Sequence, residues 1–418
     1  MDQQPRHALV VGQGSREHAL VYSLARSGHF EEIYAAPGNP GIADLAECVP
    51  YETLADLSHW CGQRAPLLVI IGPEAPLVEG LADILRRQGH WVVGPSQAAA
   101  ALEGSKAYSK EVMRRYGIPT AKAAMAHSLA ELRALIEAEV EWPHVMKQSG
   151  LAGGKGVIIV ESPTAALEVL ESWGTRPELF SDGILWEECL IGEEISVHVL
   201  TNGQGYVWLP LTRDYKRLNA LPEAPNTGGM GAFGPVLGLG ATLRAEINEK
   251  ILDRVMQFLQ DEQLLYRGVL YVGLMLTQRG PQVLEFNVRM GDPETEVIIP
   301  MMERDWGNVW LELSQGNLPS LPGEADRAAV AVVLADQRYP NPTPGGQPIR
   351  ISDSAAGLIF HGATRLREGV LEGKGGRILT AVGVGPTISE ARHQAYATLS
   401  NIEAPHTQYR LDVAEEYR

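Results

Sequence analysis

Two lysines and four glycines occupy residues 147–156, whose sequence is KQSGLAGGKG. Such a stretch has few side chains to bury in a core and loses much backbone entropy on folding. Its backbone N–H groups can instead converge on phosphate oxygens, and its lysines supply the charge that phosphate requires. The stretch is not a Walker A motif, because no Ser or Thr follows the lysine and no helix follows the loop. We therefore predict a loop between two antiparallel strands that closes over a nucleotide.

The other parts of a nucleotide site occur elsewhere in the chain. Lys106, in the sequence LEGSKAYSK, supplies a further cation before the loop. The acidic segment 187–194, EECLIGEE, is suited to a hinge that receives the base and to carboxylates for the ribose. Each part alone is a weak signal, but their order along the chain favours one nucleotide site.

The run VLEFNVRMGDPETE, residues 283–296, predicts a strand with one chemical face. The two-residue period of a strand sends Glu285, Asn287 and Arg289 to the same side. One Glu and one Asn suit magnesium, which takes few protein oxygens, and Mn²⁺ is the alternative ion. The planar guanidinium of Arg289 can hold a carboxylate with two parallel hydrogen bonds. The opposite face, predicted to be core, consists of Leu284, Phe286 and Val288.

Composition limits the classes of partner. The 35 Lys and Arg against 51 Asp and Glu give a formal charge of -16, which disfavours nucleic acid and anionic membranes. The three cysteines, Cys48, Cys61 and Cys189, lack metal-ligand spacing and indicate a reducing compartment. No apolar signal segment is found, so we expect a cytoplasmic protein, either a monomer or a homodimer, that acts on small molecules.

The elements that must position these residues fall into three groups, and we predict an α/β protein. Residues 1–103 alternate apolar strands with helices, as in a doubly wound parallel sheet whose ligands meet the carboxyl ends of the strands. Residues 104–325 form a central domain with a lid at about 122–193, and residues 326–418 form a small α+β domain. Side chains expected to be structural rather than functional are His144, His361, Met275, Met301 and Met302.

These motifs together resemble the ATP-grasp superfamily. The strings GSREHAL, APGNPGIA, IGPEAPLVEGLAD, PNTGGMGAFGP and EFNVRMGDPETE narrow the resemblance to the glycinamide ribonucleotide synthetase family. The resemblance runs from about residue 8 to the last 20 residues. It implies a ligase of purine synthesis that phosphorylates the carboxylate of glycine with ATP. The amine of phosphoribosylamine then displaces phosphate to form an amide.

The resemblance also implies site residues. Catalytic roles would fall to Arg289, Lys147 and Asp214. ATP would be bound by Lys106, Lys147, Gly150, Gly153, Gly154, Lys155, Gly156, Glu187, Glu188, Cys189, Leu190 and Glu194. The metal ligands would be Glu285 and Asn287. The acid and the amine would be bound by Gly14, Glu74, Asp214, Lys216, Asn226, Thr227, Gly228, Gly229, Met230, Arg289, Gly291, Asp292 and Glu294.

The chain departs from the family pattern at Ser15, Ser149, Arg213 and Tyr215. These departures leave open a second interpretation, an ATP-grasp ligase that couples a different carboxylic acid to a different amine. A third interpretation is an oxidoreductase built on the first domain. It is disfavoured because GQGSREH lacks the third glycine of a dinucleotide fingerprint and no acidic residue ends the second strand, IYAAP.

Overall fold

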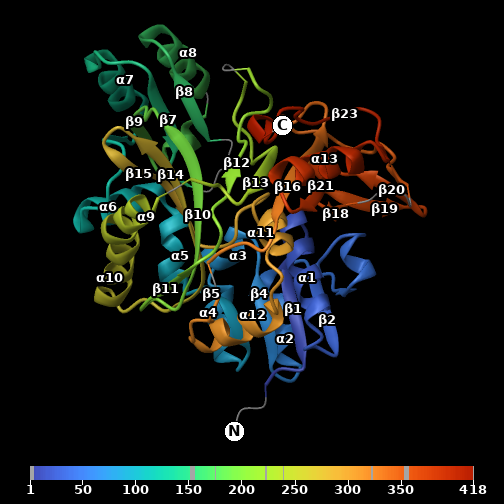
Figure 1. Cartoon of the computed structure of the whole chain (residues 1–418). Helices are drawn as coiled ribbons and strands as arrows, with labels where there is room; N and C mark the ends of the chain where they lie inside the picture. The colour runs from blue at the N-terminus through green and yellow to red at the C-terminus, as the bar shows by residue number, and fades with distance from the viewer. Residues whose placement is uncertain are drawn as a thin grey trace.

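The computed structural model describes residues 4–150, 156–174, 176–221, 224–238, 240–321, 323–352 and 357–417. Its first part is a parallel sheet in the order β3-β2-β1-β4-β5 with helices on both faces (Figure 1). The elements are β1 His7–Gly12, α1 Ser15–Ser27, β2 Glu32–Pro37, β3 Glu47–Cys48, α2 Leu54–Gly62, β4 Leu67–Ile71, α3 Glu74–Val78, α4 Leu81–Arg87, β5 Trp91–Pro95 and α5 Gln97–Gly104. The predicted doubly wound sheet is confirmed.

Both faces of this sheet are buried, which explains the continuous apolar runs of its strands. On β1, Leu9 and Val11 belong to the core on one face, whereas Ala8 and Val10 belong to the core on the other. The carboxyl ends of the strands are therefore the part of the sheet that remains available to a ligand.

A long antiparallel strand joins the first sheet to the central part of the molecule. In β14, Tyr266 pairs with Pro95 of β5, and the same strand pairs with β10 and β15. The elements here are β10 Glu193–Thr201, β11 Tyr206–Trp208, α9 Ala241–Ile247, α10 Asp253–Asp261, β14 Tyr266–Thr277, β15 Gly280–Asn287 and α11 Thr295–Met301. A π-helical turn, Asn248–Leu252, connects α9 to α10.

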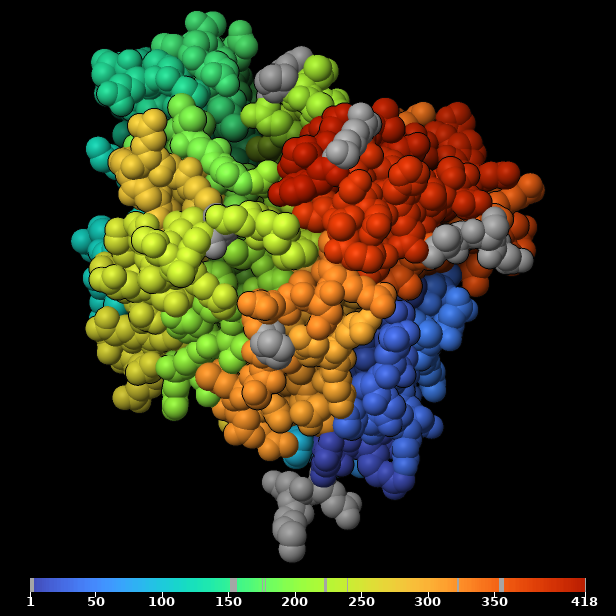
Figure 2. All heavy atoms as spheres, viewed as in Figure 1, coloured from blue at the N-terminus to red at the C-terminus, as the bar shows by residue number. Residues whose placement is uncertain are grey.

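A separate four-stranded sheet in the order β6-β9-β7-β8 projects from this body (Figure 1). Its teal and green atoms lie at the upper left of Figure 2, away from the blue N-terminal part at the lower right. The elements are α6 Lys106–Tyr116, β6 Ala123–Ala126, α7 Leu129–Ala138, β7 His144–Gln148, β8 Val157–Val160, α8 Pro163–Trp173 and β9 Ile184–Glu188. Strands β7 and β8, which flank the glycine loop, are antiparallel as predicted.

The last part is a sheet in the order β12-β13-β16-β21-β18 against which α13 packs. It includes β12 Arg213–Asp214 and β13 Gly231–Gly234, which come from the middle of the chain. The remaining elements are β16 Ala328–Asp336, β17 Arg350–Ile351, β18 Leu358–His361, β19 Thr364–Arg367, β20 Val370–Gly373, β21 Arg377–Gly385, α13 Ile388–Leu399, β22 Ile402–Glu403 and β23 Thr407–Gln408.

Helix α12, Trp306–Gln315, also crosses the expected divisions of the chain. It covers β4 and β5 of the first sheet with the fully buried Trp310, whose indole N–H lies 3.4 Å from the hydroxyl oxygen of Ser23 on α1. The parts of the molecule are thus interlocked in space. None of the helices in the described ranges has the length and apolar character that a membrane span requires.

Candidate active site

A pocket of about 840 Å³ lies where the three parts of the chain meet. Its wall combines α6, β14, β15, the loop that contains β12, turns from the first and last sheets, and strands β7, β8 and β9 of the separate four-stranded sheet. That sheet corresponds to the lid expected from the sequence. The sequence-predicted residues in the wall are Glu74, Lys106, Lys147, Gly156, Glu187, Glu188, Cys189, Leu190, Glu194, Asp214, Lys216, Asn226, Thr227, Gly228, Glu285, Asn287, Arg289, Gly291, Asp292 and Glu294.

Lys106 and Lys147 both line the pocket near the start of the glycine loop. The hydroxyl of Ser105 caps α6 by accepting from the N–H of Tyr108, which places Lys106 in the first turn. Lys106 Nζ donates to the carbonyl of Gly150 at 3.0 Å. Burial lowers the pKa of Lys106, and Glu285 opposes that shift. Both lysines therefore flank the start of the glycine loop.

Part of the predicted phosphate loop lies outside the described residues. This applies to Gly153, Gly154 and Lys155. Gly150 and Gly156 are described, and Gly156 lines the pocket. The phosphate-binding role of the loop remains a prediction.

Glu187 lies between two lysines, one of which the sequence interpretation missed. Its oxygens lie 2.6 Å from Lys147 Nζ and 2.8 Å from Lys110 Nζ. Burial alone would raise the pKa of this 1 % exposed carboxylate, but Lys147 and Lys110 hold the pKa below its ordinary value. Glu187 was expected to receive adenine, and its carboxylate is occupied in orienting Lys147. Lys110 could have been identified from the sequence, because it lies one helical turn after Lys106 and so on the same face of the helix.

The hinge from β9 to β10 lines the pocket with residues 188–192. A Cβ on Gly192 would lie 2.1 Å from the carbonyl oxygen of Leu276 on β14, so only glycine permits this approach. The carboxylate of Glu188 is held by Arg279 at 2.8 Å and by the N–H of Lys122. The hinge is therefore fixed by β14, by the turn between β14 and β15, and by the residue that precedes β6.

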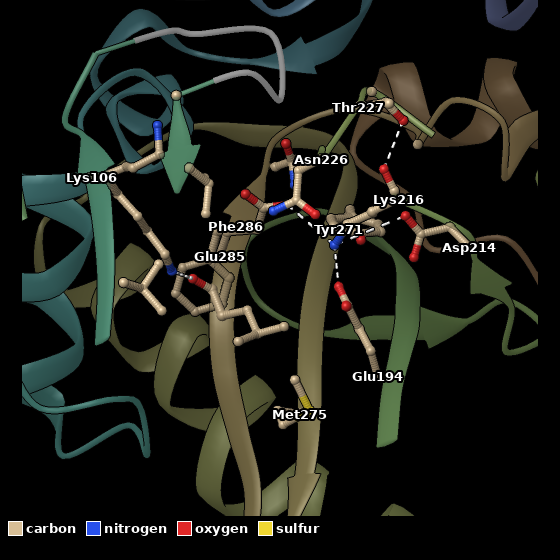
Figure 3. A pocket seen from close by; sticks show the side chains of 18 of the residues that line it. Lys106, Glu194, Asp214, Lys216, Asn226, Thr227, Tyr271, Met275, Glu285 and Phe286 are labelled. Carbon is tan, nitrogen blue, oxygen red and sulfur yellow. Dashed lines mark hydrogen bonds and ion pairs between the residues drawn. The ribbon is translucent and has the colours of Figure 1, made fainter. Parts of the chain in front are cut away.

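The middle of the pocket contains one lysine among several carboxylates. Lys216 contacts Glu194 and lies 3.7 Å from Glu285 and 3.9 Å from Asp214 (Figure 3). Burial alone would lower the pKa of Lys216, but Asp214 and Glu194 raise it well above its ordinary value. Lys216 is thus held as a cation at the centre of the acidic cluster.

Asp214 is the most deeply buried carboxylate of that cluster. Burial raises its pKa well above the ordinary value, although Lys216 acts in the opposite direction. Its Oδ1 atom has no hydrogen-bond partner among the described residues. Tyr271, from β14, lies beside it in the pocket wall (Figure 3). An unpartnered buried oxygen of this kind is available to a substrate.

Glu285 and Asn287 are both in the pocket wall, as the strand period predicted. Burial alone would raise the pKa of Glu285, but Lys216 and Lys147 hold it below the ordinary value, so the side chain is anionic. An anionic oxygen and an amide oxygen fit Mg²⁺ or Mn²⁺, which keeps most of its shell for water and phosphate. Within the described ranges no group of three or more His, Cys, Asp or Glu side chains could hold a metal ion.

A bulge in β15 makes the core position expected for Leu284 wrong. Gly273 on β14 pairs with Glu285, and the next residue pairs with Val283, so Leu284 is left out of the register. Leu284 therefore lines the pocket, and Val283 takes the core position. The period-two pattern fails at Leu284 because one residue is inserted. On the neighbouring strand β14, Met275 was also expected in the core, but it lines the pocket.

Arg289 is held by carboxylates from helices α3 and α5, which follow strands of the first sheet. Its Nη2 atom lies 2.7 Å from Glu103 and donates to Asn287 at 3.0 Å, and its Nε lies 3.4 Å from Glu74. Burial alone would lower the pKa of Arg289, but the nearby carboxylates, above all Glu103, raise the pKa above its ordinary value. The sequence interpretation missed Glu103, although it lies three residues before Lys106.

The turn after Arg289 is fixed from both neighbouring sheets. The N–H of Gly291 donates to Nε2 of the buried His198 at 3.2 Å. Asp292 pairs with Arg377 of β21 at 3.0 Å, and Glu294 accepts from Ser196 at 3.1 Å. Arg377 also donates to the carbonyl of Gly228 at 2.8 Å. Arg377 is therefore a third pocket residue, after Lys110 and Glu103, that the sequence interpretation did not select.

Three predicted substrate residues lie outside the pocket wall. Gly14 uses its N–H to bond Glu17 at 2.6 Å. Met230 is fully buried in a cluster with Ala335 and Tyr339, and Gly229 precedes it. Their suggested contacts with substrate remain predictions.

The departures from the family pattern have structural partners. Arg213 lies 3.1 Å from Glu416, and the hydroxyl of Tyr215 donates to the same carboxylate at 3.2 Å. Ser149 accepts from the N–H of Ala107 at 3.1 Å, and the hydroxyl of Ser15 lies 3.4 Å from the carbonyl of Phe360. Each of these side chains thus joins segments that are distant in the chain.

The fold and the pocket are those of an ATP-grasp protein with flanking domains. The chain matches the family description "Phosphoribosylglycinamide synthetase, ATP-grasp (A) domain" over residues 104–295, the N domain of that family over residues 6–103 and its C domain over residues 329–416. The chain belongs to the phosphoribosylglycinamide synthetase family.

Individual relatives cover nearly the whole chain. A phosphoribosylamine–glycine ligase from Caldanaerobacter subterraneus subsp. tengcongensis is 39% identical, covering 98% of this chain and 99% of that protein. Another from Leifsonia xyli subsp. xyli is 41% identical, covering 97% and 99%. The crystal structure of phosphoribosylamine–glycine ligase from Thermotoga maritima has a TM-score of 0.85 and 36% identity, covering 97% of this chain and 99% of that one. These similarities favour a ligase of glycine and phosphoribosylamine over a ligase of a different acid and amine. They also favour it over an oxidoreductase.

Proposed function

We propose that the chain is an ADP-forming ligase that joins glycine to 5-phosphoribosylamine, giving glycinamide ribonucleotide in purine biosynthesis. The observation that carries this proposal is that Lys106, Lys147, Glu285, Asn287 and Arg289 line one and the same pocket. Full-length similarity to proteins named phosphoribosylamine–glycine ligase supports the choice of substrates.

In the first step, a carboxylate oxygen of glycine attacks the γ-phosphorus of ATP. The bond from that phosphorus to the bridging oxygen breaks, and ADP leaves. Phosphoryl transfer depends mainly on positioning and charge neutralisation, which Lys106 and Lys147 would provide. Glu285 and Asn287 would hold Mg²⁺ or Mn²⁺, which supplies further charge neutralisation for the phosphates. Arg289 would hold the glycine carboxylate.

In the second step, the amine nitrogen attacks the carbonyl carbon of the acyl phosphate. The carbon–oxygen bond to phosphate breaks, and the nitrogen loses a proton. Asp214 is the candidate acceptor, because its buried Oδ1 is unpartnered and its pKa is raised. The lid would exclude water, which would otherwise hydrolyse the acyl phosphate.

The hinge from β9 to β10 would receive adenine through its backbone, and Glu194 would bind the ribose hydroxyls once Lys216 turns toward phosphate. The turns at 226–228 and 291–294 would frame the amine. We place the enzyme in the cytoplasm, as a monomer or a homodimer.

Release of ADP with a panel of acids and amines tests the proposal. Glycine with phosphoribosylamine should give turnover, and omission of either should remove it. Turnover with another acid and amine, but not with this pair, would contradict the proposal. Mass identification of the product distinguishes amide formation from uncoupled ATP hydrolysis.

A further inference from the structure

Glu103 lines the pocket beside the proposed acid-binding arginine, at a position to which neither the sequence motifs nor the family resemblance assigned a role. It is near the end of α5, where its side chain is 6 % exposed beside the junction of the first sheet and β15. A carboxylate is costly to bury unless charge and hydrogen bonds compensate for lost water. The groups that bind the Glu103 carboxylate therefore indicate its role.

The two oxygens of Glu103 bind two consecutive residues. Oε2 accepts from the backbone N–H of Val288 at 2.7 Å, and Oε1 lies 2.7 Å from Nη2 of Arg289. Val288 directly follows Asn287, the last residue of β15. The Glu103 carboxylate thus fixes the backbone directly after β15, the strand with the predicted metal ligands. It also fixes the direction of the Arg289 guanidinium.

Without that carboxylate, the guanidinium would have three weaker constraints. Asn287 accepts from Nη2 at 3.0 Å, the carbonyl of Met290 accepts from Nη1 at 3.2 Å, and the Nε contact with Glu74 is 3.4 Å. Burial leaves the pKa of Glu103 above its ordinary value even with Arg289 opposing that shift. The contact at Glu103 is the shortest ion pair that Arg289 makes among the described residues.

We propose that Glu103 is a positioning residue for the acid substrate, acting through Arg289 rather than by touching substrate. This inference rests on the proposed function, because it takes glycine as the acid. Two opposite results can be distinguished. If Glu103 orients Arg289, its loss raises the KM for glycine. If Glu103 merely competes with glycine for Arg289, its loss lowers that KM.

The test compares Glu103→Gln with wild type and with Glu111→Gln, a matched change on the exposed face of α6. We expect Glu103→Gln to raise the KM for glycine roughly tenfold while the KM for ATP changes by less than about twofold. Glu111→Gln should leave both unchanged. An unchanged or lowered KM for glycine in Glu103→Gln would overturn the inference.

A double-mutant cycle with Arg289→Lys separates positioning from general structural damage. The effect of Glu103→Gln on the glycine KM should largely disappear when Arg289 is already lysine. If the two effects multiply instead, Glu103 does not act through Arg289 and the inference fails. Should Glu103→Gln not fold, Glu103→Asp, which shortens the carboxylate, is expected to give the same selective increase.

Failure of the proposed function gives a different result. Wild-type protein without glycine-dependent ADP release would overturn both proposals. Active wild type with an unaltered Glu103→Gln variant would overturn only this inference.

Discussion

The two ends of the pocket are constructed differently. At the nucleotide end, Lys106, Lys147 and Glu187 come from α6 and the lid, and Lys110 completes their contacts. At the acid and amine end, Arg289 is held by carboxylates from helices α3 and α5 of the first part of the chain, and Asp292 is held by Arg377 from the last sheet. The first end is built within the central part of the chain, whereas the second requires all three parts.

This difference bears on how each end responds to mutation. Lys147 has one principal charged partner, so its replacement tests a direct role in phosphate chemistry. A side chain such as Arg289 has several partners, so its replacement changes a network. We therefore expect losses in turnover at the nucleotide end and selective losses in substrate affinity at the other.

The largest effect is expected from Lys147→Ala. Removal of a cation that stabilises the transferring phosphoryl group should lower kcat by about 10²- to 10³-fold. The matched variant is Lys110→Ala, because Lys110 binds the other oxygen of Glu187. The kcat of each variant is measured from steady-state ADP release. Thermal unfolding shows whether each variant is folded. Equal losses in the two variants would mean that Lys147 acts only by neutralising Glu187.

Arg289→Lys should produce the next largest effect. A lysine retains the charge but cannot contact Glu103 and Asn287 while also holding a carboxylate with two hydrogen bonds. The KM for glycine should rise by about 10- to 100-fold, and the KM for ATP should change little. Arg327→Lys, at an exposed ion pair with Glu303, is the control. A parallel rise in both KM values would contradict the proposed role of Arg289.

The sequence selected pocket residues at both ends, but it missed Lys110 at the nucleotide end and Glu103 and Arg377 at the other. The sequence placed Lys106, Glu285 and Asn287 in the site because they belong to short motifs or to the period of one strand. All three line the pocket. Arg377 was not found, since it follows an ordinary glycine turn and acquires its role only when β21 approaches residues 228 and 292. Contacts between distant segments have no local periodicity, so this part required the structure.

A similar limit applies to the fold. The parallel sheet of residues 7–95 followed from apolar runs and glycine turns. The position of α12 could not be predicted from sequence, because an apolar helix face can pack on any core. Only the structure shows that α12 packs on the first sheet. The inserted residue at Leu284 was also hidden, since a bulge leaves the alternation intact on each side while changing its phase.

Lys216 connects the two ends of the pocket and gives a smaller, measurable effect. Its ammonium lies among Glu194, Asp214 and Glu285, so it competes with any cation for these oxygens. Lys216→Met should therefore strengthen the binding of Mn²⁺ to nucleotide-free protein by about tenfold, by the Coulomb energy of a nearby unit charge. Electron paramagnetic resonance of free Mn²⁺ measures this affinity.

The control for that experiment is Lys250→Met, whose lysine pairs with Glu246 on α9. It should leave Mn²⁺ affinity unchanged. Weaker binding in Lys216→Met would show that the lysine organises the carboxylates rather than occupying their site. The comparison of the two pocket ends would then need revision, because the acidic cluster would depend on its internal cation.

The smallest effect concerns His198, which accepts from Gly291 and so supports the acid and amine end. Burial, with a smaller effect of Arg289, lowers the pKa of His198 from 6.5 to about 3. A lowered histidine pKa gives stability that is complete above the unfolded value of about 6.5 and is lost as the pH falls toward about 3. The native state should therefore weaken by up to about 2 kcal/mol between pH 7 and pH 5.

His198→Gln should remove this part of the acid sensitivity, because the amide oxygen can accept from Gly291 without taking up a proton. Urea unfolding at pH 7 and pH 5 gives the difference in the free energy of unfolding. His18 and His361 are also buried with lowered pKa values and weaken wild type and variant alike, so the difference isolates His198. The exposed His59→Gln should behave like wild type. If His198→Gln loses as much stability on acidification as wild type, His198 does not hold the turn as a neutral acceptor, and the acid and amine end is less tightly coupled to β10 than its contacts indicate.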